Sequence, residues 1–164
     1  MPTSVGMTGR LRPRVKVIAV LQEAKVAGAI SIRSDRPRGD HSEADGSVVL
    51  PDAPDPRAAS LIRAEPSLRR LVDLARKRLR ALQVWLFGSR ARGDARPDSD
   101  WDIWLILPND APDADLDPAT AWRIGRDAGL IADVVADREE DVLAAVDVVN
   151  TLAFVIPREG IRLA

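Results

Sequence analysis

The chain has 164 residues, of which 46% are hydrophobic and 30% are charged, and it contains no cysteine. This length and balance are typical of one compact domain with a buried core, with room for an appended segment. The absence of cysteine excludes disulfides, thiolate metal sites and a cysteine nucleophile, and the net charge of −1 excludes a bulk positive field that would draw the whole molecule onto nucleic acid or an anionic membrane.

The N-terminal third carries no targeting or membrane signal. Its apolar run at 17–21 is shorter than the roughly 7–15 residues of a secretory signal or the roughly 18 of a membrane span. We therefore expect a cytoplasmic protein without membrane insertion or stable nucleic-acid binding. Residues 34–57 are dense in Asp, Pro, Gly and Arg and lack a sustained period, which indicates a linker. We predict an N-terminal extension over 1–57, with a strand and a short helix within 14–33, and a separate domain over 58–164.

From Ser67 onward the hydrophobic pattern becomes regular. Apolar residues recur at helical spacing and predict an amphipathic helix that packs on a sheet; they are Leu68, Leu71, Val72, Ala75, Leu79 and Leu82. The opposite face carries the cations Arg69, Arg70, Arg76, Lys77 and Arg80. We interpret this basic face as solvated surface rather than as a binding site.

Three short apolar runs predict strands, at residues 84–87, 100–107 and 130–136. A helix is predicted after Asp117-Pro118, ending at Gly129, and another from the capping-box pattern Asp137–Glu140 to about Val146. The last 15 residues predict a helix that ends near Gly160, followed by a brief extended piece. This order of elements predicts the α/β (α+β) class, with a small mixed sheet flanked by helices.

Two carboxylates stand at the head of the second predicted strand. Asp-x-Asp occurs four times in the chain, so the pattern alone carries little weight. On a strand, however, Asp100 and Asp102 would project to one side about 7 Å apart, with Trp101 on the opposite face. Such like charges repel each other, and Thr or Val would suit a strand better. A divalent cation such as Mg²⁺ held between the two carboxylates would account for them.

A glycine-serine turn precedes these acids, with ten residues between Ser89 and Asp100. Gly88 would let the chain bend sharply after the first strand and approach a ligand closely. If a short helix begins at Ser89, its free N–H groups and the Ser89 hydroxyl would form an anion-binding corner. Arg90 and Arg92 would add positive charge near a polyphosphate. A phosphate corner beside a metal-binding pair provides the two parts needed to hold a nucleoside triphosphate with Mg²⁺.

The spacing of Gly-Ser, ten residues and Asp-x-Asp resembles the polymerase-beta-like nucleotidyltransferases, especially their minimal single-domain members (MNT). The resemblance covers about residues 65–164 and implies the fold of that superfamily. In this family a third acid lies on a later strand, and Asp133 is the residue that matches. Taken alone, Asp133 would more simply be a surface residue at a sheet edge. Given the Gly-Ser turn and the Asp-x-Asp pair, however, we expect Asp133 to join the other two acids. Beside Ile131 and Val135 it would be poorly solvated without a partner.

The resemblance implies nucleotidyl transfer, in which a hydroxyl attacks the α-phosphorus of a nucleoside triphosphate and pyrophosphate leaves. Asp100 and Asp102 would bridge two Mg²⁺ ions, and Asp133 would complete one of these sites or accept the proton directly. Gly88 and Ser89 would hold the triphosphate, for which ATP is the expected substrate. Covalent catalysis is not indicated, because Ser89 has no evident base beside it in the sequence.

Larger family members carry further domains that hold the acceptor, whereas this sequence continues little past the predicted core. By analogy with minimal members that act as antitoxins, we expect the acceptor hydroxyl on a partner protein, a helical HEPN-type toxin that receives AMP. The chain contains no tyrosine, so a tyrosyl acceptor would have to lie on another protein. Two alternatives stay open. One is a small-molecule nucleotidyltransferase of the aminoglycoside type, with the acidic loop 109–117 as its acceptor site. The other is a non-enzymatic antitoxin that binds its partner through the same fold.

Overall fold

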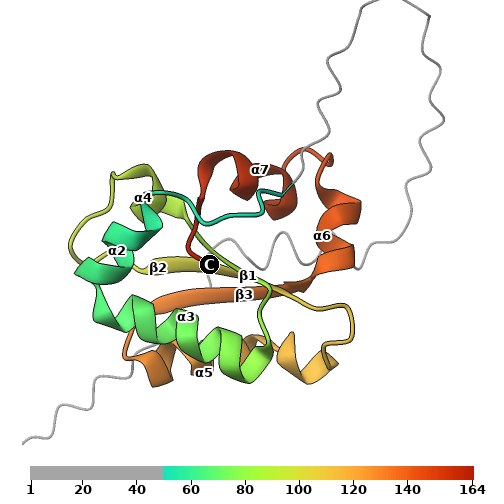
Figure 1. Cartoon of the computed structure of the whole chain (residues 1–164), viewed down its shortest axis with the longest axis horizontal. Coiled ribbons are helices and arrows are strands. Elements are labelled where there is room, and N and C mark those ends of the chain that lie inside the picture. Colours follow the sequence, from blue (N-terminus) through green and yellow to red (C-terminus); the bar gives the residue numbers. More distant parts are fainter. Residues whose placement is uncertain (1–49) are drawn as a thin grey trace, which may run out of the picture. The chain divides into compact units, whose positions relative to one another are not determined.

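A four-stranded mixed sheet forms the centre of the domain in the computed structural model, which describes residues 50–164 (Figure 1). Its strands, in the order β3-β2-β1-β4 across the sheet, are β1 (Gln83–Phe87), β2 (Trp101–Leu107), β3 (Ala132–Arg138) and β4 (Ile161–Arg162). β1 is antiparallel to β2 and β4, whereas β2 and β3 are parallel. The predicted α+β class is confirmed. The elements expected within 14–33, and most of the predicted extension, lie outside the described residues.

Helices cover both faces of this sheet (Figure 1). One face packs against α2 (Ala58–Ala64), α3 (Pro66–Leu79) and α5 (Pro118–Ala128), and the other against α6 (Glu139–Ala145) and α7 (Leu152–Glu159). Two short pieces, α4 (Gly88–Arg92) and a 3-10 turn (Asp113–Asp115), lie in the connections. Because parallel strands need a crossover, α5 lies between β2 and β3 in the chain.

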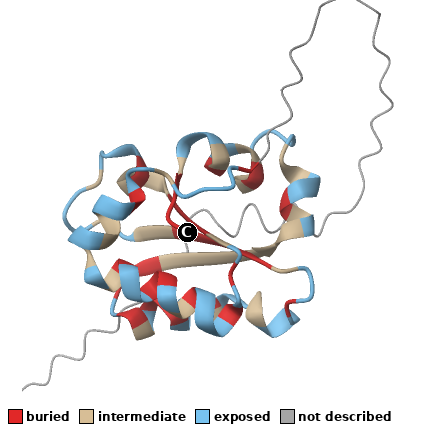
Figure 2. Cartoon of the chain, viewed as in Figure 1, coloured by how far each residue is buried: buried red, intermediate tan, exposed pale blue. Residues whose placement is uncertain are grey.

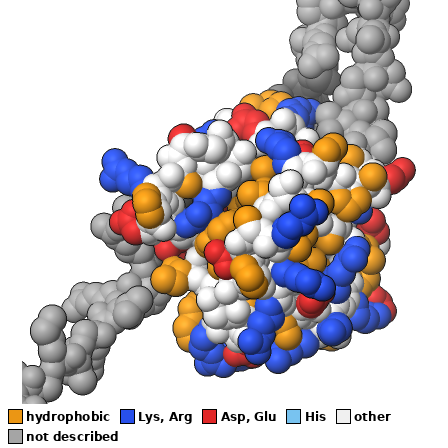
Figure 3. All heavy atoms as spheres, turned by 60° about the vertical axis from the view of Figure 1, so that its left-hand side comes forward, with side chains coloured by type: hydrophobic (Ala, Val, Ile, Leu, Met, Phe, Trp, Pro, Cys, Tyr) orange, Lys and Arg blue, Asp and Glu red, His pale blue; other side chains and the backbone are white. Residues whose placement is uncertain are grey.

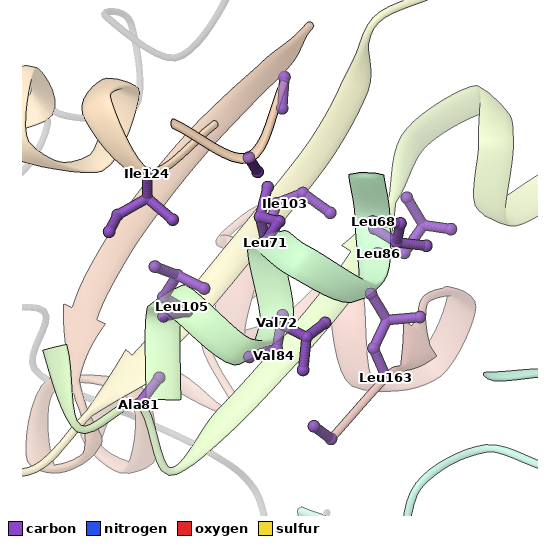
Figure 4. Packing of buried hydrophobic residues seen from close by; sticks show 14 of the residues in the cluster. Leu68, Leu71, Val72, Ala81, Val84, Leu86, Ile103, Leu105, Ile124 and Leu163 are labelled. Carbon is purple, nitrogen blue, oxygen red and sulfur yellow. The ribbon is translucent and has the colours of Figure 1, made fainter. Parts of the chain in front are cut away.

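The amphipathic helix predicted from Ser67 onward is α3. Its buried residues are Leu68, Leu71, Val72, Ala75 and Leu79. They pack against apolar side chains of β1 and β2, among them Val84, Leu86, Ile103 and Leu105 (Figure 4). The helix ends at Leu79 rather than at Leu82 as expected, because Arg80 adopts a left-handed conformation with φ 55°, and Leu82 is exposed. Each leucine buried on this face contributes about 1.5–3 kcal/mol to folding.

The opposite face of the sheet is covered by the shorter helices α6 and α7. Trp85 and Trp104 point to this side and pack with Val142 of α6 and Ile156 of α7. Both tryptophans are buried, and the middle of the sheet is covered on both sides (Figure 2). Trp101 packs with the core on the α3 side, as the strand alternation predicted. The two faces of β2 are therefore distinct along its whole length.

Side chains cap the starts of α3, α5 and α7. The side chain of Asp117 accepts a backbone N–H at the start of α5, and α5 ends at Gly129 with φ 75°, as predicted. Asp137 is not the N-cap of α6, contrary to the capping-box interpretation, because β3 continues to Arg138 in register with β2. Instead the Oδ1 atom of Asn109 accepts the backbone N–H of Glu140 at 2.9 Å, so a loop that follows β2 holds the start of α6.

The C-terminal part of the chain completes the sheet. α7 begins after Thr151, whose hydroxyl accepts the backbone N–H of Phe154 at 3.1 Å, and it ends before Gly160. The short β4 then pairs with β1. The predicted helix and brief extended piece are both present. Among residues 50–164, no helix combines the length and apolar character that crossing a membrane requires.

Candidate functional site

The bend after β1 presents hydrogen-bond donors at one end of the sheet. Gly88 follows the strand directly with φ 69°, and α4 begins at this residue. Phe87 occupies the N-cap position of α4 and provides no side-chain acceptor for its first N–H groups. The Ser89 hydroxyl has no hydrogen-bond partner among residues 50–164. Backbone N–H groups and a hydroxyl at a bend of this kind suit an anionic ligand.

The backbone of Gly88 lies directly against the carboxylate of Asp102. Phe87 and Asp102 are partners in the antiparallel register, which places the next residue, Gly88, beside the start of β2. A Cβ atom at Gly88 would lie 2.0 Å from Asp102 Oδ2 and 2.9 Å from Asp102 Cγ. The site therefore requires glycine at residue 88, because both the positive φ and this contact exclude a side chain.

The parallel register of β2 and β3 makes Asp102 and Asp133 neighbours across the two strands. Both lie on the face that carries Trp104 and Val135, while Ile103 and Val134 pack on the opposite face. Asp100 is exposed and lies one residue before β2 begins. The structure thus brings Asp133 to the same end and face of the sheet as Asp102, as the sequence interpretation required. The role of these acids as metal ligands stays a prediction.

Burial and mutual repulsion disfavour the charged forms of two of these carboxylates. Burial raises the pKa of Asp102, and the nearby charges of Asp133 and Asp100 raise it further, while Arg92 and Arg90 oppose the shift. The pKa of Asp133 is likewise raised, by burial first and then by the charge of Asp100. The three acids are therefore close enough to influence one another. Blue Lys and Arg side chains are spread over the face that Figure 3 turns forward, on the α4 side of the molecule.

The carboxylates fit a divalent cation in their chemistry. No group of three or more acidic or histidine side chains within residues 50–164 is already spaced to surround a metal ion. However, carboxylate oxygens are the ligands that Mg²⁺ prefers, and a cation would oppose both the burial and the repulsion that raise the pKa of Asp102. Neighbouring carboxylates that repel one another are expected to turn apart without a cation. Asp100, Asp102 and Asp133 are thus the residues that could hold Mg²⁺ here, by rotation of their side chains.

The two arginines of α4 have different environments. Nε and Nη2 of Arg90 donate to the carbonyl of Ser99 at 3.1 and 2.6 Å, and its guanidinium lies 4.3 Å from the centre of the Trp101 ring. The side chain of Arg92 is 53% exposed and makes a 3.4 Å ion pair with the exposed Asp94. The sequence interpretation assigned both arginines to a polyphosphate. Arg92 could exchange its exposed ion pair for a phosphate contact, whereas Arg90 is already bound to the loop before β2.

Sequence patterns did not indicate the contact of Arg90 with Ser99, because it depends on the path of an irregular loop. One partial signal exists: Trp101 was expected on the face away from the acids, and the bend at Gly88 was expected beside the acids that flank this ring. A cation two residues after Gly88 could then have been considered as a partner for that ring.

The acidic loop 109–117 lies at the other end of β2 from Asp102. Three of its four acids make contacts within the fold. Asp110 pairs with Arg80 at 2.9 Å, Asp113 pairs with Arg138 at 2.5 Å, and Asp117 caps α5. This loop therefore has neither free acids at these three positions nor a place beside the carboxylates of Asp102 and Asp133.

A family model for the nucleotidyltransferase domain matches residues 68–157, which run from α3 to α7 and include Gly88, Ser89 and all three acids. Among solved structures, a chain from Sulfolobus solfataricus described as a "putative nucleotidyltransferase" is 24% identical. The match covers 51% of this chain and 74% of that chain, with a TM-score of 0.37. No curated protein matches this chain.

Proposed function

The chain belongs to the nucleotidyltransferase domain family, and from this premise we propose that it transfers AMP from ATP to a hydroxyl group of a protein partner. The observation that carries the proposal is the meeting of Asp102 with Asp133 across the parallel strands, beside the bend at Gly88. A structural role alone would not favour two half-buried acids held side by side with raised pKa values.

The three carboxylates provide the metal-binding part of the site. Asp100, Asp102 and Asp133 would hold Mg²⁺, which neutralises phosphate charge and makes a hydroxyl a stronger nucleophile when it is bound. Asp133 would also accept the proton of the attacking hydroxyl. In this reaction a bond forms between the acceptor oxygen and the α-phosphorus, the bond from that phosphorus to the bridging oxygen breaks, and pyrophosphate leaves with the electron pair.

The bend at the start of α4 provides the phosphate-binding part. The first N–H groups of α4 and the Ser89 hydroxyl would donate to phosphate oxygens. The exposed guanidinium of Arg92 would add a charge-assisted contact. Because these donors and the Asp102 carboxylate meet at Gly88, a triphosphate bound at the bend would lie next to the carboxylates.

Three features support a protein as the acceptor. The sequence resembles minimal nucleotidyltransferases that modify a helical HEPN-type toxin, and the chain has no tyrosine of its own to serve as a tyrosyl acceptor. Apolar side chains are also more than half exposed on and after α6, namely Leu143 (53%), Val148 (52%) and Val149 (63%). We propose that these side chains belong to the surface that receives the partner. The contacts of Asp110, Asp113 and Asp117 within the fold weaken the case for loop 109–117 as the acceptor site of an aminoglycoside-type enzyme.

Transfer with differently labelled ATP tests the proposal. The full chain would be incubated with Mg²⁺, a candidate helical partner protein and ATP labelled at either the α- or the γ-phosphate. We expect label to reach the partner from α-labelled ATP only, and to be absent with Asp102→Asn. Transfer to an aminoglycoside but not to protein would contradict the acceptor class. Tight partner binding without any transfer would contradict the enzymatic assignment.

A further inference from the structure

Arg90 connects the short helix α4 to the loop that carries Asp100. Two of its nitrogens, Nε and Nη2, donate to the single carbonyl oxygen of Ser99 at 3.1 and 2.6 Å. Nη2 also approaches the carbonyl of Pro97 at 3.5 Å, the long limit of a hydrogen bond. The guanidinium carbon lies 4.3 Å from the centre of the Trp101 ring, at the start of β2. The edge of the guanidinium thus faces the loop, and its charge lies over an aromatic ring.

The loop between Gly93 and Asp100 is joined to α4 near its start by the backbone N–H of Asp94, which donates to the Ser89 carbonyl at 3.1 Å, and near its end by the side chain of Arg90. Within the loop, the backbone N–H of Arg96 donates to the Ser99 hydroxyl at 2.9 Å, and the Ser99 N–H donates to the Arg96 carbonyl at 3.0 Å. These bonds close a local turn but do not attach it to the domain. In the part of the chain that the structure describes, Arg90 is the side chain that joins this turn to α4.

We propose that Arg90 is a positioning residue that holds Asp100 in place for the metal, a role that rests on the function proposed above. The Ser99 carbonyl and the Asp100 nitrogen belong to the same planar peptide group. Holding that carbonyl with two hydrogen bonds therefore fixes the direction in which the chain enters Asp100. Without this contact Asp100, which is exposed and precedes the strand, would lack a side-chain tether to α4.

An arginine is needed for this task. Its planar guanidinium can donate two hydrogen bonds to one oxygen and still stack on an aromatic ring, whereas a lysine ammonium has neither the fork nor the flat face. The assignment also separates the two arginines of α4. Arg90 acts on the loop, and Arg92, exposed and two residues away, stays available for phosphate.

The test compares Arg90→Lys with Arg92→Lys, which remove the guanidinium and keep the charge. Hydrogen exchange of the loop 93–100 would be measured in metal-free full-length protein, followed by titration with Mn²⁺ alone and then with ATP in the absence of metal. For Arg90→Lys we expect faster exchange in the loop and Mn²⁺ affinity lower by about 10–100-fold, the range for groups that orient metal ligands. ATP binding without metal should be unchanged. For Arg92→Lys we expect the reverse pattern, with weaker ATP binding and unchanged exchange.

Thermal unfolding of both variants serves as the control for general loss of structure. Unchanged loop exchange and unchanged Mn²⁺ affinity in Arg90→Lys, together with weaker ATP binding, would overturn the inference and make Arg90 a phosphate ligand. If the unaltered protein binds no Mn²⁺, the proposed function fails, and with it the reason for positioning Asp100. Loop exchange would still show whether Arg90 holds the segment, so the two failures can be told apart.

Discussion

The carboxylate of Asp102 lies in the space that a side chain at Gly88 would need, with its Oδ2 atom 2.0 Å from the position of an added Cβ. The contact joins the two halves of the candidate site, because Gly88 opens the phosphate-binding bend and Asp102 belongs to the acidic group. A change at either residue is therefore expected to affect the other.

Gly88→Ala is expected to impair transfer by displacing the Asp102 carboxylate. The variant also carries the cost of a positive φ for alanine, about 1–2 kcal/mol. Gly129→Ala is the matched control, since Gly129 has φ 75° and its added Cβ meets nothing within 4 Å. Both variants should lose similar stability from backbone strain. Transfer should fall by about 100-fold or more only in Gly88→Ala, as expected for a misplaced catalytic group. Equal transfer rates in the two variants would show that the contact has no functional role.

Asp102→Asn is expected to remove transfer while the fold is preserved. The substitution keeps the volume of the side chain and removes one ligand charge. We expect activity to fall by more than about 100-fold, because even residues that only support metal ligands cost 10–100-fold when changed. Asp73→Asn on the exposed face of α3 removes the same charge away from the site and serves as the control. Near-normal turnover by Asp102→Asn, with circular dichroism unchanged, would refute the metal-ligand assignment.

The fold was largely predictable from local patterns. The apolar spacing of α3, the Asp117-Pro118 start of α5 and the runs that became β1 to β3 are all encoded within short windows. The start of α6 was misjudged because pairing with β2 extends β3 to Arg138, and a tertiary contact overrode a local capping pattern. The helix α2 was not predicted, and the pairing of β4 with β1 joins residues far apart in the chain.

The candidate site was predictable in its residue types but not in its contacts. Motif spacing identified Gly88 and Asp102, the family resemblance added Asp133, and strand register explains why they meet. The different environments of Arg90 and Arg92 were not predictable, because the path of the loop 93–100 decides which guanidinium reaches the Ser99 carbonyl. Irregular segments carry no periodic signal from which such a path could be derived.

Metal-free protein is expected to gain stability from Asp102 on mild acidification. Because the folded-state pKa values of Asp102 and Asp133 are raised, the folded protein binds their protons more tightly than the unfolded chain does. The contribution of these groups to the free energy of unfolding therefore increases as the pH falls. The increase begins at their folded-state pKa values and is complete below the ordinary value of about 3.9. At neutral pH both groups oppose folding.

Urea midpoints measured in chelator at several pH values would check this expectation. Asp102→Asn should be more stable than the unaltered protein at about pH 7.5, and the difference should shrink toward pH 4. Addition of Mg²⁺ should also reduce the difference, by stabilising only the protein that retains the carboxylate. A difference that is constant across this pH range would mean that the charge of Asp102 costs the folded protein nothing.

Asp127 is expected to show the opposite dependence on pH. Arg78 of α3 donates to its carboxylate at 2.6 Å, and the hydrogen bonds from Arg78 and then from Arg126 lower the pKa of this group. A lowered folded-state pKa means that its stabilisation is present above the unfolded value of about 3.9 and is lost as pH falls through the folded value. Asp127→Asn should therefore destabilise the domain slightly at neutral pH and have no effect in stronger acid.

Because this pair joins the exposed sides of α3 and α5, salt should weaken it, and the effect should be small even at low ionic strength. A double-mutant cycle with Arg78→Gln and Asp127→Asn, followed by urea unfolding at low and high salt, measures the coupling directly. We expect a favourable coupling that decreases with salt at neutral pH. A coupling that survives high salt would indicate that the ion pair is shielded from solvent, contrary to the exposure of both side chains. The charge of Asp127 is thus expected to stabilise the fold, whereas the charge of Asp102 is expected to destabilise it. An acid whose charge destabilises the fold is a candidate for a functional site.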